Sequence, residues 1–144
     1  MRILIDADGC PVVDIAVRIA KENNIECLIL CDTAHFFNKE GATTIIVSQG
    51  ADSVDFKLVN MLQNGDIVIT QDYGLAAMCL ARKAIPISQD GMVFDQDNID
   101  ALLLARHTAK KIRNAGGRLK GNAKRIVAQD VAFAEKLKKI ITTN

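Results

Sequence analysis

Short apolar runs alternate with segments of helical periodicity along this chain, and this alternation is the feature that most limits its fold. The runs predicted to form strands are residues 3–5, 25–31, 43–47, 67–70 and 85–88. Helices are predicted from Pro11 to about residue 20 and over residues 54–62, 75–84, 98–114 and 128–141. Such alternation predicts an α/β fold in which helices cover both faces of a mainly parallel sheet.

The whole chain is expected to form one domain, because 144 residues are enough to bury a single core. The basic helical segment from about residue 98 to residue 144 is expected to belong to the same domain. No apolar run approaches the ~18 residues that a membrane span requires. The first residues lack the apolar core of a signal peptide, so we expect a cytoplasmic protein. The sequence leaves the oligomeric state open, and a homo-oligomer is compatible with it.

Several aspartates lie directly before or after the predicted strands. Asp6 directly follows the first strand and Asp72 follows the fourth, so both are expected in the crevice outside the carboxyl ends of a parallel sheet. Asp8 either joins them or caps the next helix. Asp66 precedes its strand, which predicts a turn role at the opposite edge of the sheet.

Two further aspartates lie at the start of the helix predicted near residue 54. Asp52 and Asp55 are three residues apart and share a helix face if the helix begins at or before Asp52, whereas Asp52 is otherwise its N-cap. The candidate metal ligands are therefore Asp6, Asp8, Asp52, Asp55 and Asp72, and the candidate catalytic residues are Asp6, Asp55 and Asp72.

Carboxylates this close together repel one another unless a cation lies among them. Oxygen ligands without histidine favour Mg²⁺ or Mn²⁺, and such an ion can activate water for attack on a phosphodiester. Candidates to orient water or phosphate around this site are Ser48, Thr70, Gln71, Tyr73 and His107.

The four cysteines lack the spacing of a zinc site. Cys27, Cys31 and Cys79 lie within apolar runs and are expected to be buried as small hydrophobic side chains. Cys10 precedes Pro11 where a helix is expected to begin, a position that can lower a thiol pKa, although a structural thiol also fits.

Charge is divided unevenly along the chain. Residues 1–105 carry seven Lys and Arg and 15 Asp and Glu, a formal charge of −8, whereas residues 106–144 carry 11 and two, a charge of +9. A basic segment of this kind attracts a polyanion, and RNA is the expected partner. The candidate phosphate contacts are Arg106, Lys110, Arg113, Arg118, Lys120, Lys124 and Arg125. Because the chain has no Trp, one Tyr and five Phe, we expect recognition led by the nucleic-acid backbone and weakly specific for sequence, with Tyr73 as a candidate for stacking on one base or for packing.

Four motifs in order resemble the bacterial YaiI/YqxD family of PIN-like proteins. The motifs begin at Asp6, Gly50, Gly65 and Arg106, the last with the later Gly-Gly-Arg-Leu-Lys-Gly run of residues 116–121, and the similarity covers essentially the whole chain. The resemblance implies a PIN-like three-layer α/β/α sandwich. Most proteins of the wider PIN group are metal-dependent ribonucleases with three or four acids.

By this resemblance, Asp6 corresponds to the acid that ends the first strand, Asp55 to the acid of the central helix, and Asp72 to the acid after a later strand. Asp8 and Asp52 correspond to additions specific to the family. This chain has Gly-Asn at residues 121–122 where relatives often have Gly-Pro, which bears on the stiffness of that loop.

Two other functions remain open at this stage. The opening Ile-Leu-Ile-Asp-Ala-Asp-Gly of residues 3–9 also fits a haloacid-dehalogenase-type phosphatase with Asp6 as nucleophile and Asp8 as general acid. That assignment leaves Asp52 and Asp55 without a role. A non-catalytic RNA-binding or regulatory protein with a metal-binding or decayed site is the other alternative.

Overall fold

The computed structural model describes residues 1–33, 37–50, 52–117 and 123–143. Its sheet has five strands, all parallel, in the order β3-β2-β1-β4-β5. The strands are β1 (Arg2–Asp6), β2 (Glu26–Asp32), β3 (Thr43–Val47), β4 (Ile67–Ile69) and β5 (Ile85–Ile87). The predicted α/β class and parallel sheet are therefore confirmed, and the arrangement is consistent with a PIN-like sandwich.

Five helices occur among the described residues, and each matches a predicted one. They are α1 (Val13–Glu22), α2 (Ser53–Met61), α3 (Tyr73–Ala81), α4 (Gln96–Asn114) and α5 (Val127–Thr143). The start of α1 differs from the prediction: Pro11 lies in a turn before the helix, and Val12 occupies the N-cap position. None of these helices is both long and apolar enough to cross a membrane.

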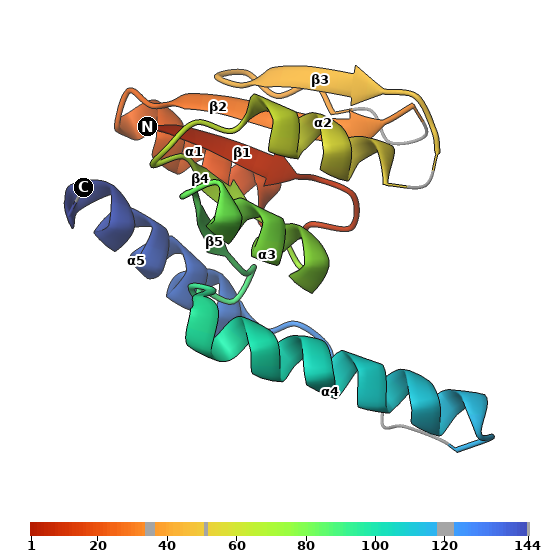
Figure 1. Cartoon of the computed structure of the whole chain (residues 1–144). Helices are drawn as coiled ribbons and strands as arrows, with labels where there is room; N and C mark the ends of the chain where they lie inside the picture. Colours follow the sequence, from red (N-terminus) through yellow and green to blue (C-terminus); the bar gives the residue numbers. More distant parts are fainter. Residues whose placement is uncertain (34–36, 51, 118–122, 144) are drawn as a thin grey trace.

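The two faces of the sheet are covered by different helices (Figure 1). Ile3 and Ile5 point to the face that packs on α1 and α5, while Leu4 points to the face that packs on α2 and α3. All three side chains are fully buried, because alternate residues of a strand face opposite sides of the sheet. Burying each one contributes about 1.5–3 kcal/mol.

Helix α4 packs on α3 rather than on the sheet. A small core of Ala76, Phe94 and Ile99 joins the two helices, and Asp95 caps α4 through a reciprocal pair of hydrogen bonds with Asn98. From Leu104 onward the helix is largely exposed and projects away from the sheet (Figure 1). The second half of α4 is therefore a basic arm attached to the body through its first half; residues 104–114 are called the α4 arm below.

The strand order fixes where a ligand crevice can form. The chain runs from β1 to β2 and β3 on one side of the sheet and then returns to β4 and β5 on the other side of β1. The reversal between β1 and β4 leaves a crevice at the carboxyl ends of these strands. Asp6 ends β1, and Thr70 follows β4, so both lie beside this crevice.

Candidate functional site

Asp6 and Asp72 are joined through one buried hydroxyl. The Thr70 Oγ1 donates a hydrogen bond to Asp6 Oδ2 over 2.8 Å and accepts one from the Asp72 backbone N–H over 3.0 Å. Thr70 is only 2% exposed, so packing holds its hydroxyl in place. The predicted orienting residue Thr70 thus links the Asp6 carboxylate to the backbone of Asp72.

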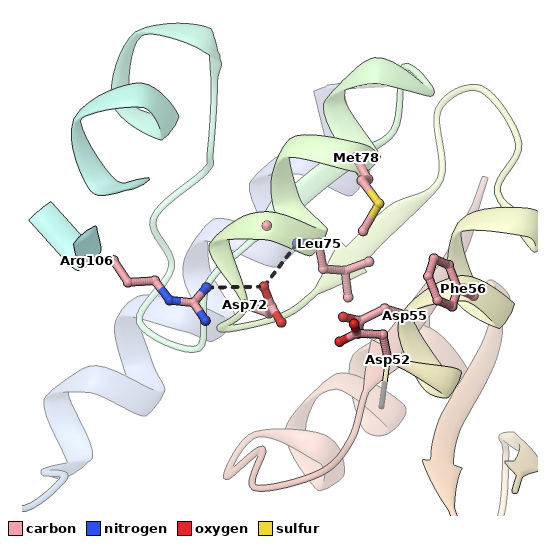
Figure 2. A pocket seen from close by; sticks show the side chains of 8 residues that line it. Asp52, Asp55, Phe56, Asp72, Leu75, Met78 and Arg106 are labelled. Atoms are coloured by element: carbon pink, nitrogen blue, oxygen red, sulfur yellow. Dashed lines mark hydrogen bonds and ion pairs between the residues drawn. The ribbon is translucent and has the colours of Figure 1, made fainter. Parts of the chain in front are cut away.

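Asp72 also caps helix α3. Its Oδ1 accepts a hydrogen bond from the Leu75 backbone N–H over 3.1 Å, and Arg106 Nη1 of α4 lies 3.8 Å from the same oxygen. Figure 2 shows Arg106 reaching toward Asp72 from the side opposite to Asp52 and Asp55. The cap fixes the carboxylate on a rigid element, and the arginine supplies a positive charge at its edge.

Asp52 and Asp55 lie at the start of α2. Asp52 occupies the N-cap position with left-handed backbone angles, φ 62° and ψ 14°, and its side chain makes no capping hydrogen bond. Asp55 lies in the first turn of the helix. The structure places Asp52 just outside the helix and not within it, yet both carboxylates still line the same cavity.

All five predicted metal ligands line one cavity of about 300 Å³, called the acidic cavity below. The side chains that line it include Asp6, Asp8, Asp32, Asp52, Asp55 and Asp72. Asp32 was missed by sequence reasoning, although it ends β2 just as Asp6 ends β1 and the same strand-end rule would have found it. Asp66 lies at the opposite edge of the sheet, as predicted, and is buried there against Arg2.

Two carboxylates of the acidic cavity, Asp6 and Asp55, have a raised pKa. Burial raises the pKa of Asp6, the Thr70 hydrogen bond opposes that rise, and the charges of Asp72 and Asp8 add to it. Burial, followed by the charges of Asp72, Asp6 and Asp52, raises the pKa of Asp55 to about 6. Asp6 and Asp55 are therefore harder to ionise, chiefly because they are buried and also because their neighbours carry charge.

This donor set fits a hard divalent cation in its chemistry. Carboxylates from three elements line the cavity, and a cation would offset the neighbouring charges that add to burial in raising the pKa of Asp55. Over the described ranges, no group of three or more His, Cys, Asp or Glu residues has the geometry to hold a metal ion as it stands. The side chains outline a site that would have to draw together around an ion.

The raised pKa of Asp55 makes the stability of the metal-free protein depend on pH. Because the folded pKa of about 6 lies above the ordinary value of 3.8, the protonated carboxyl stabilises the fold; this contribution is complete below about pH 4 and is lost as the pH rises through 6. We expect Asp55→Asn to melt at the same temperature as the wild type near pH 4 and at a higher temperature near pH 7.5. Thermal denaturation in EDTA measures this, with the exposed Asp97→Asn as control. A difference that does not change with pH would contradict the assignment.

The other predicted orienting residues occupy different places. Gln71 and Tyr73 line a neighbouring cavity of about 420 Å³ together with Asp6, Asp8, Asp72 and Arg106. The Tyr73 ring also packs on Phe94, with 5.9 Å between ring centroids, as the packing alternative predicts, and stacking on a base stays a prediction. Ser48 is exposed after β3, and His107 is exposed on α4 beside Arg106. Neither belongs to the described residues that line these cavities.

The predicted basic contacts also lie in different parts of the protein. Arg106 lines the cavities, whereas Lys110 and Arg113 lie on the exposed α4 arm and Lys124 is exposed in the segment before α5. Arg118 and Lys120 lie outside the described residues.

The Arg125 side chain is held by contacts within the protein. Its Nη1 donates to Asp90 Oδ1 over 2.7 Å, its Nε to Asp130 Oδ1 over 2.8 Å, and its Nη2 to the Gln89 carbonyl over 2.7 Å. Its side chain is 20% exposed. These contacts tie the loop after β5 to the start of α5, which is a structural role for this guanidinium.

The thiols agree with the prediction of buried small side chains. Cys27, Cys31 and Cys79 are buried, and burial raises the pKa of Cys27 and of Cys79 to about 12. Cys10 is half-buried, and burial raises its pKa. The lowered pKa considered for Cys10 is therefore wrong, because desolvation outweighs the nearby helix start.

Comparison with known proteins places this site in a family. The family model described as "Uncharacterized BCR, YaiI/YqxD family" matches residues 4–143. A UPF0178 protein of Exiguobacterium sibiricum is 53% identical over 99% of this chain and 97% of its own length, and one of Clostridium acetobutylicum is 45% identical over 98% and 97%. A UPF0178 protein of Ruminiclostridium cellulolyticum is 48% identical over 95% and 90%. No solved structure matches the chain. The chain therefore belongs to the YaiI/YqxD family, which confirms the resemblance carried by its four motifs.

Proposed function

We propose that this protein is a nuclease that depends on Mg²⁺ or Mn²⁺ and hydrolyses phosphodiester bonds of RNA. One observation carries the proposal: carboxylates from β1, α2 and the start of α3 meet in the acidic cavity, at the point where the strand order reverses. Burial, followed by the charges of the crowded neighbouring carboxylates, raises the pKa of Asp55 to about 6. A structural role for the cluster leaves this crowding unexplained, because it costs stability at neutral pH.

Different residues would bind the metal ion and the phosphate. Asp6, Asp55 and Asp72 would hold the ion, with Asp8 and Asp52 as further candidate ligands that line the same cavity. A bound ion would supply an activated water and offset the charge of the phosphate. Thr70 orients Asp6 through its 2.8 Å hydrogen bond, and such second contacts support metal affinity.

Arg106 is the described basic residue placed to hold the phosphate. Its guanidinium lies 3.8 Å from Asp72 and lines two of the cavities. Lys110 and Arg113 on the α4 arm and Lys124 extend the positive charge beyond it. The choice of RNA over DNA rests on the resemblance to the PIN group, and contacts of this kind predict weak sequence specificity.

An assay with defined substrates tests the proposal. We expect single-stranded RNA to be cut with Mn²⁺ or Mg²⁺ and left intact in EDTA. The new ends should be a 3′-hydroxyl and a 5′-phosphate, or a 3′-phosphate and a 5′-hydroxyl. Cyclic phosphate ends would contradict it, because they arise from attack by the 2′-hydroxyl and not by water. Hydrolysis of a phosphomonoester alone would favour the phosphatase alternative, and RNA binding without cleavage would favour the non-catalytic one.

A further inference from the structure

Helix α2 exposes a phenylalanine directly beside the acidic cavity. Phe56 follows Asp55 and is 60% exposed, whereas Leu58 on the same helix is fully buried. Phe56 is not a member of the described core clusters. Its ring therefore adds little to the packing of the fold and is accessible to a ligand.

The ring borders a cavity that adjoins the acidic cavity and is called the apolar-walled cavity here. This cavity has a volume of about 290 Å³ and is lined by Phe56, Leu75 and Met78 on one side and by Asp52, Asp55 and Asp72 on the other. In Figure 2, Phe56, Met78 and Leu75 surround the same space, with the carboxylates next to it. The volume is at the lower end of the ~300–1,000 Å³ of small-molecule pockets, which suits a group the size of one base.

Arg106 gives this cavity a second recognition element. It lines the cavity together with the apolar side chains, and it lies across Asp72 from Asp55 (Figure 2). An aromatic ring, a thioether and a guanidinium around one small space match the parts of a nucleotide: a flat base for the ring and sulfur, and a phosphate for the arginine. Tyr73, the aromatic residue considered for stacking from the sequence, contacts Phe94 and lines the neighbouring cavity of about 420 Å³, not this one.

We infer that the apolar-walled cavity is the subsite for one unpaired nucleobase of the substrate strand, which stacks on Phe56. The inference rests on the proposed function and specifies its substrate: the strand must be single-stranded at this point, because a base inside a duplex does not offer its face to a protein ring. An apolar side chain of a bound peptide is the competing occupant. Such a side chain would bind against the apolar wall of the cavity, and its binding would not require a nucleobase in the ligand.

Binding of a single-stranded RNA octamer that carries one 2-aminopurine tests the subsite. The fluorescence of 2-aminopurine reports stacking, and Ca²⁺ serves as the divalent ion so that binding is measured apart from cleavage. We expect Phe56→Ala to weaken binding about 5- to 100-fold and to abolish the fluorescence change, since stacking contributes ~1–3 kcal/mol per base. Phe56→Tyr is expected to retain both, and Phe56→Leu to be intermediate.

Two controls separate the base from the phosphate. Ile46→Ala removes a comparably exposed apolar side chain from β3 and is expected to have no effect. The second control is a series of octamers, each of which lacks the base at one position. For the octamer that lacks the base in the subsite, Phe56→Ala should bind as tightly as the wild type. Arg106→Gln should weaken the binding of every octamer to the same extent. Phe56→Ala that matches Ile46→Ala, or that weakens all abasic octamers equally, would overturn the inference.

The outcomes also separate this inference from the proposed function. Metal-dependent cleavage with no role for Phe56 leaves the nuclease and removes the subsite. Stacking on Phe56 without cleavage leaves the subsite and removes the nuclease. A wild-type protein that binds none of the octamers but binds an apolar peptide through Phe56 overturns both.

Discussion

Asp6→Asn is expected to lower metal-dependent RNA cleavage by at least ~100-fold and to abolish the rise in melting temperature that Mn²⁺ gives the wild type. Asp6 ends the central strand, is held by Thr70, and faces the carboxylates of Asp55 and Asp72. The substitution keeps the shape of the side chain but removes one negative charge. Because a metal ion supplies several kcal/mol of charge stabilisation in such reactions, and ~1.4 kcal/mol is tenfold in rate, loss of a ligand at the centre of the site has a large effect.

Matched variants make this result specific. Asp14→Asn removes the same charge from an exposed position on α1, across the sheet, and is expected to cleave like the wild type. Thr70→Val keeps Asp6 but removes its hydrogen bond, so an intermediate loss of ~10–100-fold is expected. Single-turnover cleavage and thermal denaturation over a Mn²⁺ titration measure both effects. Asp6→Asn that keeps the full metal-induced rise would refute the assignment of Asp6 as a ligand.

Asp66→Ala is expected to reduce the free energy of unfolding by about 3 kcal/mol. Asp66 is 1% exposed, and its carboxylate accepts hydrogen bonds from the Arg2 side chain, the Arg2 backbone N–H and the Gln63 backbone N–H. Removing it leaves two amides without their acceptor and takes the carboxylate partner from a largely buried guanidinium, which keeps its hydrogen bond to the Met61 carbonyl. The cost of breaking such a pair exceeds the value of the pair itself, because the remaining charge stays desolvated.

Urea denaturation at neutral pH measures this loss. The exposed Asp100→Ala is the control and is expected to stay within about 0.5 kcal/mol of the wild type. Arg2→Met combined with Asp66→Ala should cost less than the two single changes added together, since both remove the same interaction. At temperatures where Asp66→Ala is folded, its response to Mn²⁺ should be that of the wild type. A cost below 1 kcal/mol would mean that water replaces the carboxylate.

Most of the architecture could be predicted because local patterns in this chain agree with the fold. The β-branched run of β3 (Thr43–Val47) has the predicted bounds, and the apolar run of β1 leads directly to Asp6. The start of α1 could not be placed, because Pro11 is compatible both with a first helical turn and with the turn that precedes it. Boundaries of this kind depend on packing that neighbouring residues do not reveal.

The site was predictable where it follows from local position in the sequence. Asp52 and Asp55 were found from their spacing at the start of a helix, and other carboxylates from the ends of strands. Asp6 and Asp72 were found by that rule, and Asp32 obeys it too. The approach of Arg106 to Asp72 was a different matter, since it depends on how Ile99 and its neighbours seat α4 on α3. Phe56 belongs to the same class, because an exposed aromatic residue on a helix becomes informative only when the opposite wall of its cavity is known.

Helix α4 is packed against the protein in its first half and exposed in its second half. Ile99 and the Asp95 cap hold its first turns, the exposed stretch begins at Leu104, and Arg106 lies two residues beyond that point. The arginine thus takes its position from the stiffness of the helix and not from packing around its own side chain, which is 61% exposed. If RNA binds along the α4 arm, as proposed, any displacement of the arm also changes the distance from the Arg106 guanidinium to Asp72, so phosphate binding far from the acidic cavity is coupled to the charge at its edge.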